Sequence, residues 1–209
     1  TLRPGKDTPL WNALVAELGR AEADFADPSA IERAVLKAGA LDAVINAVAY
    51  TAVDRAEQEE AIAHRVNAES VEAMARACAA RGVPLIHIST DYVYDGAKPG
   101  PYVESDPTAP LNAYGRTKLA GENRIRDLLS AHVILRTSWI YNASGRNFMT
   151  TMLRLGQERD EVRVVDDQHG APTSARELAQ AVGAIARQIT GPAAQFGTYH
   201  YADAGETSW

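Results

Sequence analysis

Short apolar runs alternate with longer amphipathic stretches along most of the chain. Residues 42–49 and 83–89 form apolar runs without a polar residue at every second position, which is typical of strands buried on both faces of a sheet. A shorter run of this kind lies at residues 133–135. The stretches around these runs have the length and spacing of helices. We expect these helices at residues 28–39, 56–81 and 112–129.

The ends of the helical stretches carry typical start and stop residues. Asp27 precedes Pro28, an N-cap followed by a first-turn proline, and Gly39 closes the stretch. In residues 56–81 acidic side chains come early and basic ones late, with Gly82 just beyond, as a helix dipole favours. The alternation of strands and helices predicts a doubly wound α/β fold, a Rossmann-like parallel sheet with helices on both faces. Ligands of such sheets bind at the carboxyl ends of the strands.

The pattern is looser after Tyr141. There we expect helices at about 147–158 and 175–189, strands at 162–165 and 199–201, and turns at 166–173. We therefore divide the chain into a Rossmann-like NAD(P)-binding domain at residues 1–141 and a mixed segment at 142–209 that includes part of a small substrate-binding region. We expect both ends to be incomplete, because the chain starts without Met and no closing element precedes Trp209.

Composition excludes several classes of protein. The chain has 209 residues, 46% of them hydrophobic, and a net charge of −6, so we expect no nucleic acid as a partner. No apolar run approaches the ~18 residues of a membrane span, so we expect no membrane partner either. The lone Cys78 can form neither an internal disulfide nor a cysteine-based zinc site, which fits a cytoplasmic location. The five histidines lack metal-like spacing, and we expect structural roles for them.

The pattern Tyr-x-x-x-Lys occurs twice. Tyr94 and Lys98 span an Asp-Gly pair and precede Pro-Gly, so we assign them to a loop. Tyr114 and Lys118 lie in a helical stretch, where residues four apart share a face. The Lys118 ammonium can then lie beside the Tyr114 phenol and bring its pKa closer to neutral, as proton transfer requires. The alternative for this pair is an exposed position on the helix surface.

The segment Ser89-Thr90-Asp91 leaves a predicted strand at the edge where ligands bind. Its hydroxyl groups can bind a carbonyl oxygen, or they can merely satisfy backbone groups of the loop. Thr90 and the pair Tyr114–Lys118 follow one another in the expected order, and together they are a stronger signal than either is alone.

Several sequence blocks, taken in order, resemble one family. They lie at residues 46–54, 89–94, 110–122, 136–139 and 167–173. They are similar to the dTDP-4-dehydrorhamnose reductases, extended short-chain dehydrogenases/reductases that make dTDP-L-rhamnose for cell-surface polysaccharides such as the O-antigen of lipopolysaccharide. The resemblance extends from Asp24 to Trp209.

The resemblance implies the catalytic roles. Tyr114 would protonate the C4 oxygen of the sugar while NADPH or NADH gives a hydride to C4. Lys118 would hold the ribose hydroxyls and tune Tyr114, and Thr90 would hydrogen-bond the reacting oxygen. An alkoxide that develops at C4 needs donors aimed at it, so this arrangement is physically consistent.

The resemblance also implies binding residues. Contacts to the cofactor would come from Asp24, Phe25, Ala49, Tyr50 and Thr51, besides Tyr114 and Lys118. Contacts to the dTDP-sugar would come from Thr90, Asp91 and Trp139. Two structural alternatives stay open: Asp24 as the cap of the helix at Pro28, and Trp139 as a core residue. The family further implies a homodimer and Mg²⁺, for which the sequence identifies no ligands.

Two departures from related patterns affect this interpretation. Related dehydratases carry Asp-Glu after the threonine, whereas Tyr92 follows Asp91 here, so ketone reduction is favoured over dehydration. The glycine-rich phosphate-binding turn is missing, since Gly5 and Gly19 are the only glycines before Gly39. We expect the N-terminal βα unit to lie outside this sequence; the alternative is that the protein does not bind a dinucleotide in the usual way.

Three questions stay open at this point. Arg3 or Lys6 would be candidates for binding a 2′-phosphate, but the sequence does not decide between NADH and NADPH. The substrate can be another nucleotide-linked 4-ketosugar. A different class is also open, a non-catalytic regulatory subunit that resembles the beta subunit of methionine adenosyltransferase.

Overall fold

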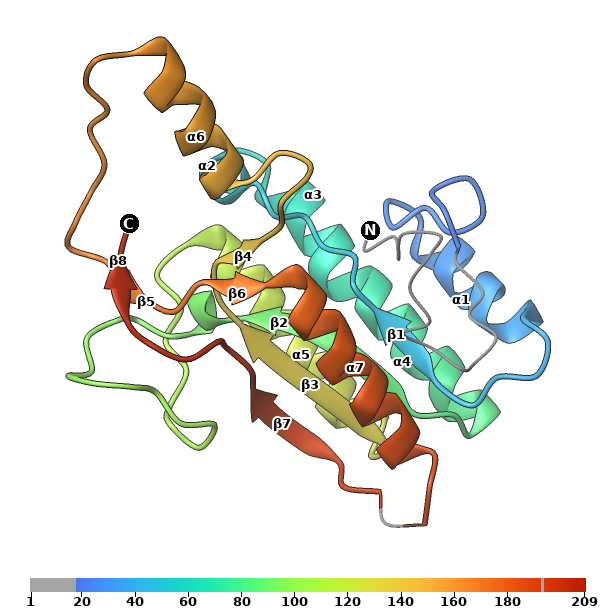
Figure 1. Ribbon diagram of the computed structural model, residues 1–209. Coiled ribbons are helices and arrows are strands. Elements are labelled where there is room, and N and C mark those ends of the chain that lie inside the picture. Colours follow the sequence, from blue (N-terminus) through green and yellow to red (C-terminus); the bar gives the residue numbers. More distant parts are fainter. Residues whose placement is uncertain (1–17, 193) are drawn as a thin grey trace.

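The computed structural model describes residues 18–192 and 194–209 (Figure 1). Its central sheet has four parallel strands in the order β1-β2-β3-β7. These are β1 (Val44–Asn46), β2 (Leu85–Thr90), β3 (His132–Thr137) and β7 (Gly197–His200). Parallel neighbours need long crossover connections, and helices form most of them. The predicted doubly wound α/β fold class is confirmed.

Helices cover both faces of the sheet (Figure 1). One face carries α4 (Ser70–Arg81) and α5 (Ala113–Leu128), with α1 (Pro28–Lys37) packed against α4. The other face carries α7 (Ala175–Ile189). Because successive side chains of a strand point to opposite faces, Leu85 packs in the core under α4 and α5 while Ile86 packs in the core under α7.

The first predicted strand differs from expectation. Residues 42–49 were expected to be buried on both faces, but β1 has three residues, and Ile45 and Val48 are 38% and 40% exposed. The reason is that β1 is an edge strand of the described sheet and pairs with β2 alone. The expectation of burial on both faces is therefore wrong for the described residues.

The predicted helix at 56–81 consists of several pieces. After α2 (Val53–Ala56), a continuous run contains α3 (Glu60–His64), the π-helical segment η1 (Arg65–Glu69) and α4, and Gly82 closes it in a left-handed conformation, φ 64°. The backbone of η1 lies directly against α5, since a Cβ added at Gly121 would lie 2.1 Å from the carbonyl oxygen of Asn67. The wider π turn thus faces a glycine that admits it.

The last part of the chain adds short elements. These are β4 (Ile140–Tyr141), α6 (Phe148–Glu158), β5 (His169–Gly170), β6 (Thr173–Ser174) and β8 (Thr207–Ser208), with β4 paired to β6 and β5 to β8. The helices expected at 147–158 and 175–189 are confirmed. Figure 1 shows α6 projecting away from the sheet.

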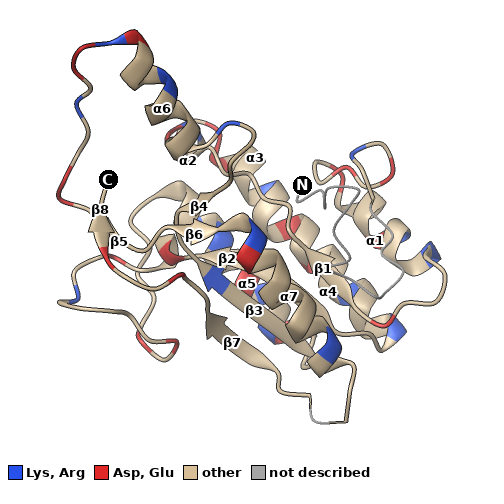
Figure 2. Cartoon of the chain, viewed as in Figure 1, with Lys and Arg blue, Asp and Glu red and all other residues tan. Residues whose placement is uncertain are grey.

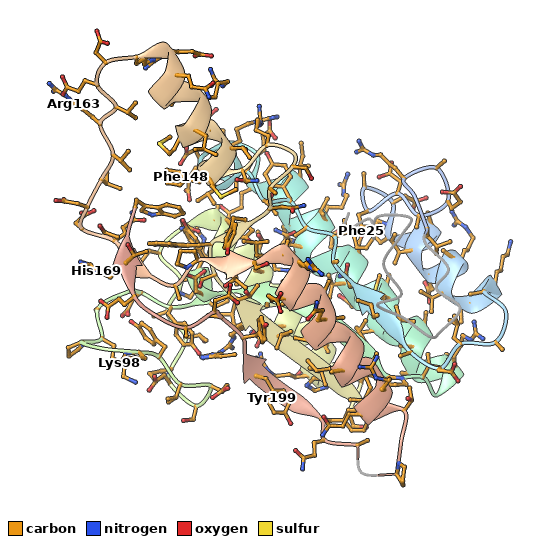
Figure 3. The ribbon with its side chains drawn as sticks, viewed as in Figure 1. Phe25, Lys98, Phe148, Arg163, His169 and Tyr199 are labelled. Atoms are coloured by element: carbon orange, nitrogen blue, oxygen red, sulfur yellow. The ribbon has the colours of Figure 1, made fainter. Side chains whose placement is uncertain are left out.

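The strand expected at 162–165 is wrong. These residues have no strand partner, and the side chains of Val164 and Val165 are 41% and 55% exposed. Figure 3 shows Arg163 on the extended segment that follows α6, away from the central sheet. An apolar pattern needs a neighbouring strand to become part of a sheet, and none lies beside this segment in the described structure.

The division at Tyr141 stays a prediction. Both α7 and β7 come from residues 142–209, yet they contribute a layer and a strand to the central α/β unit.

Figure 2 shows basic and acidic positions interspersed over the elements. Among the described helices, none is long and apolar enough to cross a membrane.

Candidate active site

The candidate site forms where β2 ends and α5 begins. Thr90 ends β2, and its hydroxyl accepts a hydrogen bond from the backbone N–H of Tyr92 at 3.2 Å, which starts the short helix η2 (Asp91–Val93). Asn112 caps α5 by accepting from the backbone N–H of Gly115 at 2.8 Å. The two segments approach so closely that a Cβ at Gly115 would lie 2.2 Å from the Tyr92 carbonyl oxygen. This glycine lets the first turn of α5 reach the strand end.

Tyr114 is a buried, neutral phenol. Its side chain is 9% exposed, and its ring makes an edge contact with Tyr92 at a centroid distance of 5.5 Å. Burial raises the pKa of Tyr114 to about 12, although a side-chain hydrogen bond with Thr90 acts in the opposite direction. The expected lowering of its pKa by Lys118 is therefore wrong, because the effect of burial prevails. A phenol that holds its proton at neutral pH suits proton donation.

Lys118 lies one helical turn later and is 1% exposed. Its amine donates to the carbonyl oxygen of Ile88 at 2.8 Å and lies 3.1 Å from Nε2 of His87. Burial lowers the pKa of Lys118 to about 8, with Glu122 acting in the opposite direction. Both members of the predicted pair are thus buried at the strand end, and the alternative of an exposed surface pair is wrong.

Asp91 lies beside the same strand end. Its Oδ1 accepts a hydrogen bond from the Thr90 hydroxyl at 3.1 Å, and burial raises its pKa.

The loop expected for the second Tyr-x-x-x-Lys pattern is also found, because Lys98 lies outside any helix and pairs with Asp106 at 2.5 Å (Figure 3).

The loop after β1 is tied to α5 through one buried side chain. Asn67 of η1 accepts from the backbone N–H of Tyr50 at 2.8 Å, donates to its carbonyl oxygen at 3.1 Å, and donates to the Thr117 hydroxyl at 3.1 Å. Tyr50, the middle residue of the predicted cofactor loop at 49–51, is therefore held relative to the helix of Tyr114. Sequence reasoning missed Asn67, for which an asparagine inside a predicted helix was the only signal.

Asp24 and Phe25 lie beside α1. Asp27 caps this helix by accepting from the backbone N–H of Ser29 at 3.0 Å, so the alternative that Asp24 is the cap is wrong. Asp24 instead accepts from the backbone N–H of Ala26 at 2.9 Å. Phe25 packs against the core near α1 (Figure 3), and its carbonyl oxygen accepts from the Ser70 hydroxyl at 2.8 Å. Their contact with the adenine stays a prediction.

Trp139 follows β3 in a strained conformation with φ 45°. Its ring stacks on Trp209 at a centroid distance of 3.8 Å, and a Cβ at Gly170 would lie 3.0 Å from it. Phe148 packs against Trp209, with a distance of 4.3 Å between the two ring centroids. Trp139 is half-buried rather than a core residue, so its structural alternative is wrong.

A buried ion pair supports the site from behind. Arg136 of β3 donates to both carboxylate oxygens of Glu122, at 3.0 and 2.7 Å, and the Ser89 hydroxyl donates to the same carboxylate at 2.5 Å. Glu122 is 0% exposed. This arrangement joins β2, β3 and α5, so it fixes the helix that carries Tyr114 and Lys118 to the sheet.

The donors at this edge fit the nicotinamide-ribose end of a dinucleotide. Lys118 supplies N–H donors, and Thr137, which is paired in register with Thr90, has a buried hydroxyl without a hydrogen-bond partner among the described residues. A buried orphan hydroxyl is a group that a ligand can satisfy. Sequence reasoning missed Thr137. Arg3 and Lys6, the candidates for a 2′-phosphate, lie outside the described residues.

The residues do not fit Mg²⁺ in the same way. Within residues 18–192 and 194–209, no three His, Cys, Asp or Glu side chains are grouped as metal ligands would be. The Mg²⁺ that the family resemblance implies therefore stays an expectation, and it enters no step below.

A parallel sheet with Thr90 at a strand end and a buried Tyr-x-x-x-Lys pair on the next helix defines a short-chain dehydrogenase/reductase type of protein. The family model for the RmlD substrate binding domain matches residues 10–209. The chain therefore belongs to the RmlD family, the family of the dTDP-4-dehydrorhamnose reductases.

Individual relatives agree with this family. The chain is 47% identical over 197 residues to a dTDP-4-dehydrorhamnose reductase of Sinorhizobium fredii, covering 93% of this chain and 66% of the relative. It is 43% identical over 203 residues to that of Escherichia coli K12, covering 96% and 68%. The crystal structure of the Bacillus anthracis reductase in complex with NADP is similar, with a TM-score of 0.85, 37% identity and coverage of 92% and 66%. The chain thus spans about two thirds of its relatives' length.

Proposed function

We propose that the protein reduces the C4 ketone of dTDP-4-dehydro-L-rhamnose to dTDP-L-rhamnose with NAD(P)H, as a step in the synthesis of cell-surface polysaccharide. The observation that carries the proposal is the convergence of Thr90, Tyr114 and Lys118 at the carboxyl end of β2. The relatives named as reductases of this substrate support it, as does the NADP in one of their structures.

The described side chains account for the proton side of the reaction. NAD(P)H, when bound, supplies the hydride to C4. Tyr114 donates its phenolic proton to the C4 oxygen, and the Thr90 hydroxyl hydrogen-bonds the same oxygen as negative charge develops there. Burial of Tyr114 excludes water, which would otherwise weaken these hydrogen bonds.

Lys118 has two proposed roles. Its N–H groups bind ribose hydroxyls, and its charge stabilises the Tyr114 phenolate that remains after proton transfer. Asp91 and Trp139 are proposed to contact the dTDP-sugar, and Asp24, Phe25 and residues 49–51 the cofactor. The homodimer, the cytoplasmic location and the division at Tyr141 stay predictions.

The decisive experiment mixes the full-length protein with dTDP-4-dehydrorhamnose and NADPH or NADH, and follows the absorbance of the reduced nicotinamide. We expect oxidation that depends on both protein and sugar, with dTDP-L-rhamnose identified by mass spectrometry. Comparison of the two cofactors ranks them.

Two outcomes would contradict the proposal. Turnover of a different nucleotide-linked 4-ketosugar, but not of this one, would keep the chemistry and change the substrate. No turnover of any ketosugar by folded protein, together with a stable stoichiometric enzyme partner, would favour the regulatory-subunit alternative.

A further inference from the structure

Buried polar contacts join Lys118 to the end of β1. The Lys118 amine lies 3.1 Å from Nε2 of His87, and Nδ1 of the same imidazole lies 3.0 Å from Nδ2 of Asn46. Asn46 and Lys118 are 1% exposed, and His87 is 0% exposed. Bulk water therefore cannot replace a missing partner, so each polar atom depends on its neighbours for hydrogen bonds.

The orientation of the Asn46 amide follows from its neighbours. The backbone N–H of Val48 can only donate, and it lies 3.0 Å from Oδ1 of Asn46. The amide nitrogen therefore faces His87 and donates to Nδ1. Since Nδ1 accepts, the neutral imidazole carries its proton on Nε2, the atom that faces Lys118.

This proton position decides which form of Lys118 fits. An ammonium has three N–H donors and no acceptor, so it would face the Nε2 proton donor to donor. A neutral amine accepts from Nε2–H with its lone pair and still donates to the Ile88 carbonyl oxygen at 2.8 Å. The chain of hydrogen bonds is complete only with the neutral amine.

The charged form of Lys118 requires a rearrangement. The imidazole must move its proton to Nδ1, where it meets the Asn46 amide nitrogen as a second donor. Asn46 must then give up its hydrogen bond to either His87 or Val48, and a buried donor left without a partner costs free energy. The charge of Lys118 and the tautomer of His87 are thus coupled.

We propose that Asn46 and His87 are positioning residues that favour the neutral amine of Lys118 in the cofactor-free protein, and that His87 changes tautomer when Lys118 gains or loses its proton. The proposal rests on the proposed function in one respect, that Lys118 is the residue that binds the ribose. A lysine that titrates near neutral pH can then become charged as the ribose hydroxyls accept its hydrogen bonds.

The other titratable groups near Lys118 do not replace this coupling. On α5, Tyr114 precedes it and is neutral, while Glu122 follows it and favours the ammonium, but Glu122 is already bound by Arg136 and Arg126. Burial, and then the charge of Lys118, lowers the pKa of His87 well below its ordinary value, so the imidazole stays neutral. The lowered pKa of Lys118 agrees with the geometry.

Nitrogen NMR of ¹⁵N-histidine-labelled full-length protein tests the coupling without cofactor. We expect His87 to change from the Nδ1–H to the Nε2–H form between about pH 7 and about pH 10, at the same midpoint as Lys118, followed by ¹³C NMR of its Cε. If His87 keeps the Nδ1–H form throughout, or if Lys118 titrates at its ordinary pKa, the proposal is overturned.

Two variants at one position separate coupling from charge. Asn46→Asp keeps the acceptor for Val48 but presents an oxygen to Nδ1, so we expect a permanent Nδ1–H form and a Lys118 midpoint higher by at least about one pH unit. Asn46→Leu removes the donor without adding charge and raises the midpoint in the same direction. Unchanged midpoints in both variants would refute the role of Asn46.

The matched control is His64→Gln, at a half-exposed position on α3, which leaves both midpoints unchanged. The failures of the two proposals are distinguishable. A His87 tautomer change in a protein without reductase activity overturns the proposed function alone, whereas an active reductase whose His87 never changes tautomer overturns this inference alone.

Discussion

Two buried basic side chains on the same side of the sheet have opposite electrostatic surroundings. Arg136 is 4% exposed and faces the fully buried carboxylate of Glu122, whereas Lys118 is 1% exposed and faces an imidazole and a carbonyl oxygen. Burial lowers the pKa of Arg136, but hydrogen bonding and charge from Glu122 outweigh it and raise the pKa. For Lys118 burial prevails, and its pKa is lowered to about 8.

The difference distinguishes Arg136, a cation with a structural role, from Lys118, a cation whose protonation state can change. A cation with its own buried counter-charge stays charged at every physiological pH, so it can only hold elements together. A cation among neutral acceptors keeps a protonation equilibrium close to neutral pH, which a ligand can shift. Helix α5 contributes to both cases, because Lys118 lies in its first half and Glu122, the counter-charge of Arg136, lies in its second.

The largest effect is expected when the buried ion pair between Arg136 and Glu122 is removed. Glu122→Ala leaves Arg136 buried without its counter-charge, and we expect the free energy of unfolding to fall by about 3–5 kcal/mol in urea denaturation. The control is Glu158→Ala, which removes an exposed pair with Arg154 on α6 and costs less than about 1 kcal/mol. Equal losses in the two variants would contradict a structural role for the buried pair.

Tyr114→Phe tests the catalytic side of this comparison. Loss of the proton donor is expected to slow single-turnover oxidation of the reduced nicotinamide by about 100- to 10,000-fold. The free energy of unfolding is expected to change little, because the ring still packs against Tyr92. Tyr199→Phe on β7 is the matched control and keeps the parent rate. A Tyr114→Phe rate within about threefold of the parent would exclude the role of acid.

The pH dependence of stability sharpens the comparison. The pKa of Lys118 is about 8 in the folded protein and 10.5 ordinarily, so the unfolded state binds more protons between these values. The contribution of Lys118 to the unfolding free energy therefore rises by up to about 3 kcal/mol from pH 8 to pH 10.5 and is lost as the pH falls.

This contribution is measured as the difference between the parent and Lys118→Met in urea denaturation across that range. The difference removes the opposite effects of Cys78 and Tyr114, whose pKa values burial raises to about 12. A difference that does not depend on pH would show that Lys118 has an ordinary pKa when folded.

The smallest effects are expected at Gly115 and Gly121, where the backbone of another segment packs closely against α5. Gly115→Ala and Gly121→Ala place a Cβ 2.2 and 2.1 Å from backbone oxygens, and each is expected to lose about 1–3 kcal/mol of unfolding free energy. Only Gly115→Ala is expected to slow hydride transfer as well, because Tyr114 is its neighbour.

Gly156→Ala on α6 is the control for both glycines. A Cβ there has no atom within 4 Å, so we expect stabilisation by roughly 0.5–1 kcal/mol. Thermal unfolding of the three variants gives the ranking. Equal loss of hydride transfer in Gly115→Ala and Gly121→Ala would contradict the assignment of the catalytic role to the first half of α5 and of the structural role to its second half.

The sequence predicted what depends on local pattern. The apolar run at 83–89, the helix around Tyr114 and the strand end at Thr90 were all recognisable because spacing and strand termination are local properties. The strand expected at 162–165 failed because pairing needs a neighbour that local pattern does not supply. Resemblance to a family, rather than spacing, supplied the individual roles of the site residues.

Charge states lay beyond sequence reasoning for a different reason. The pKa values of Tyr114 and Lys118 are set by burial that only the folded chain creates. Asn46 and His87 were likewise not recognisable as neighbours of Lys118, because their contacts join β1, β2 and α5. The same applies to Asn67, whose position in a π turn is not a local pattern.

The wholly parallel central sheet has a consequence for how the chain folds. Each pair of neighbouring strands is separated by roughly 40 to 65 residues, so no hairpin can nucleate the sheet and every pairing must wait for a crossover to form. Such high contact order favours slow folding and prolonged exposure of strand edges. The topology that gathers Thr90 and Tyr114 at one edge of the sheet therefore also delays the pairing of its strands.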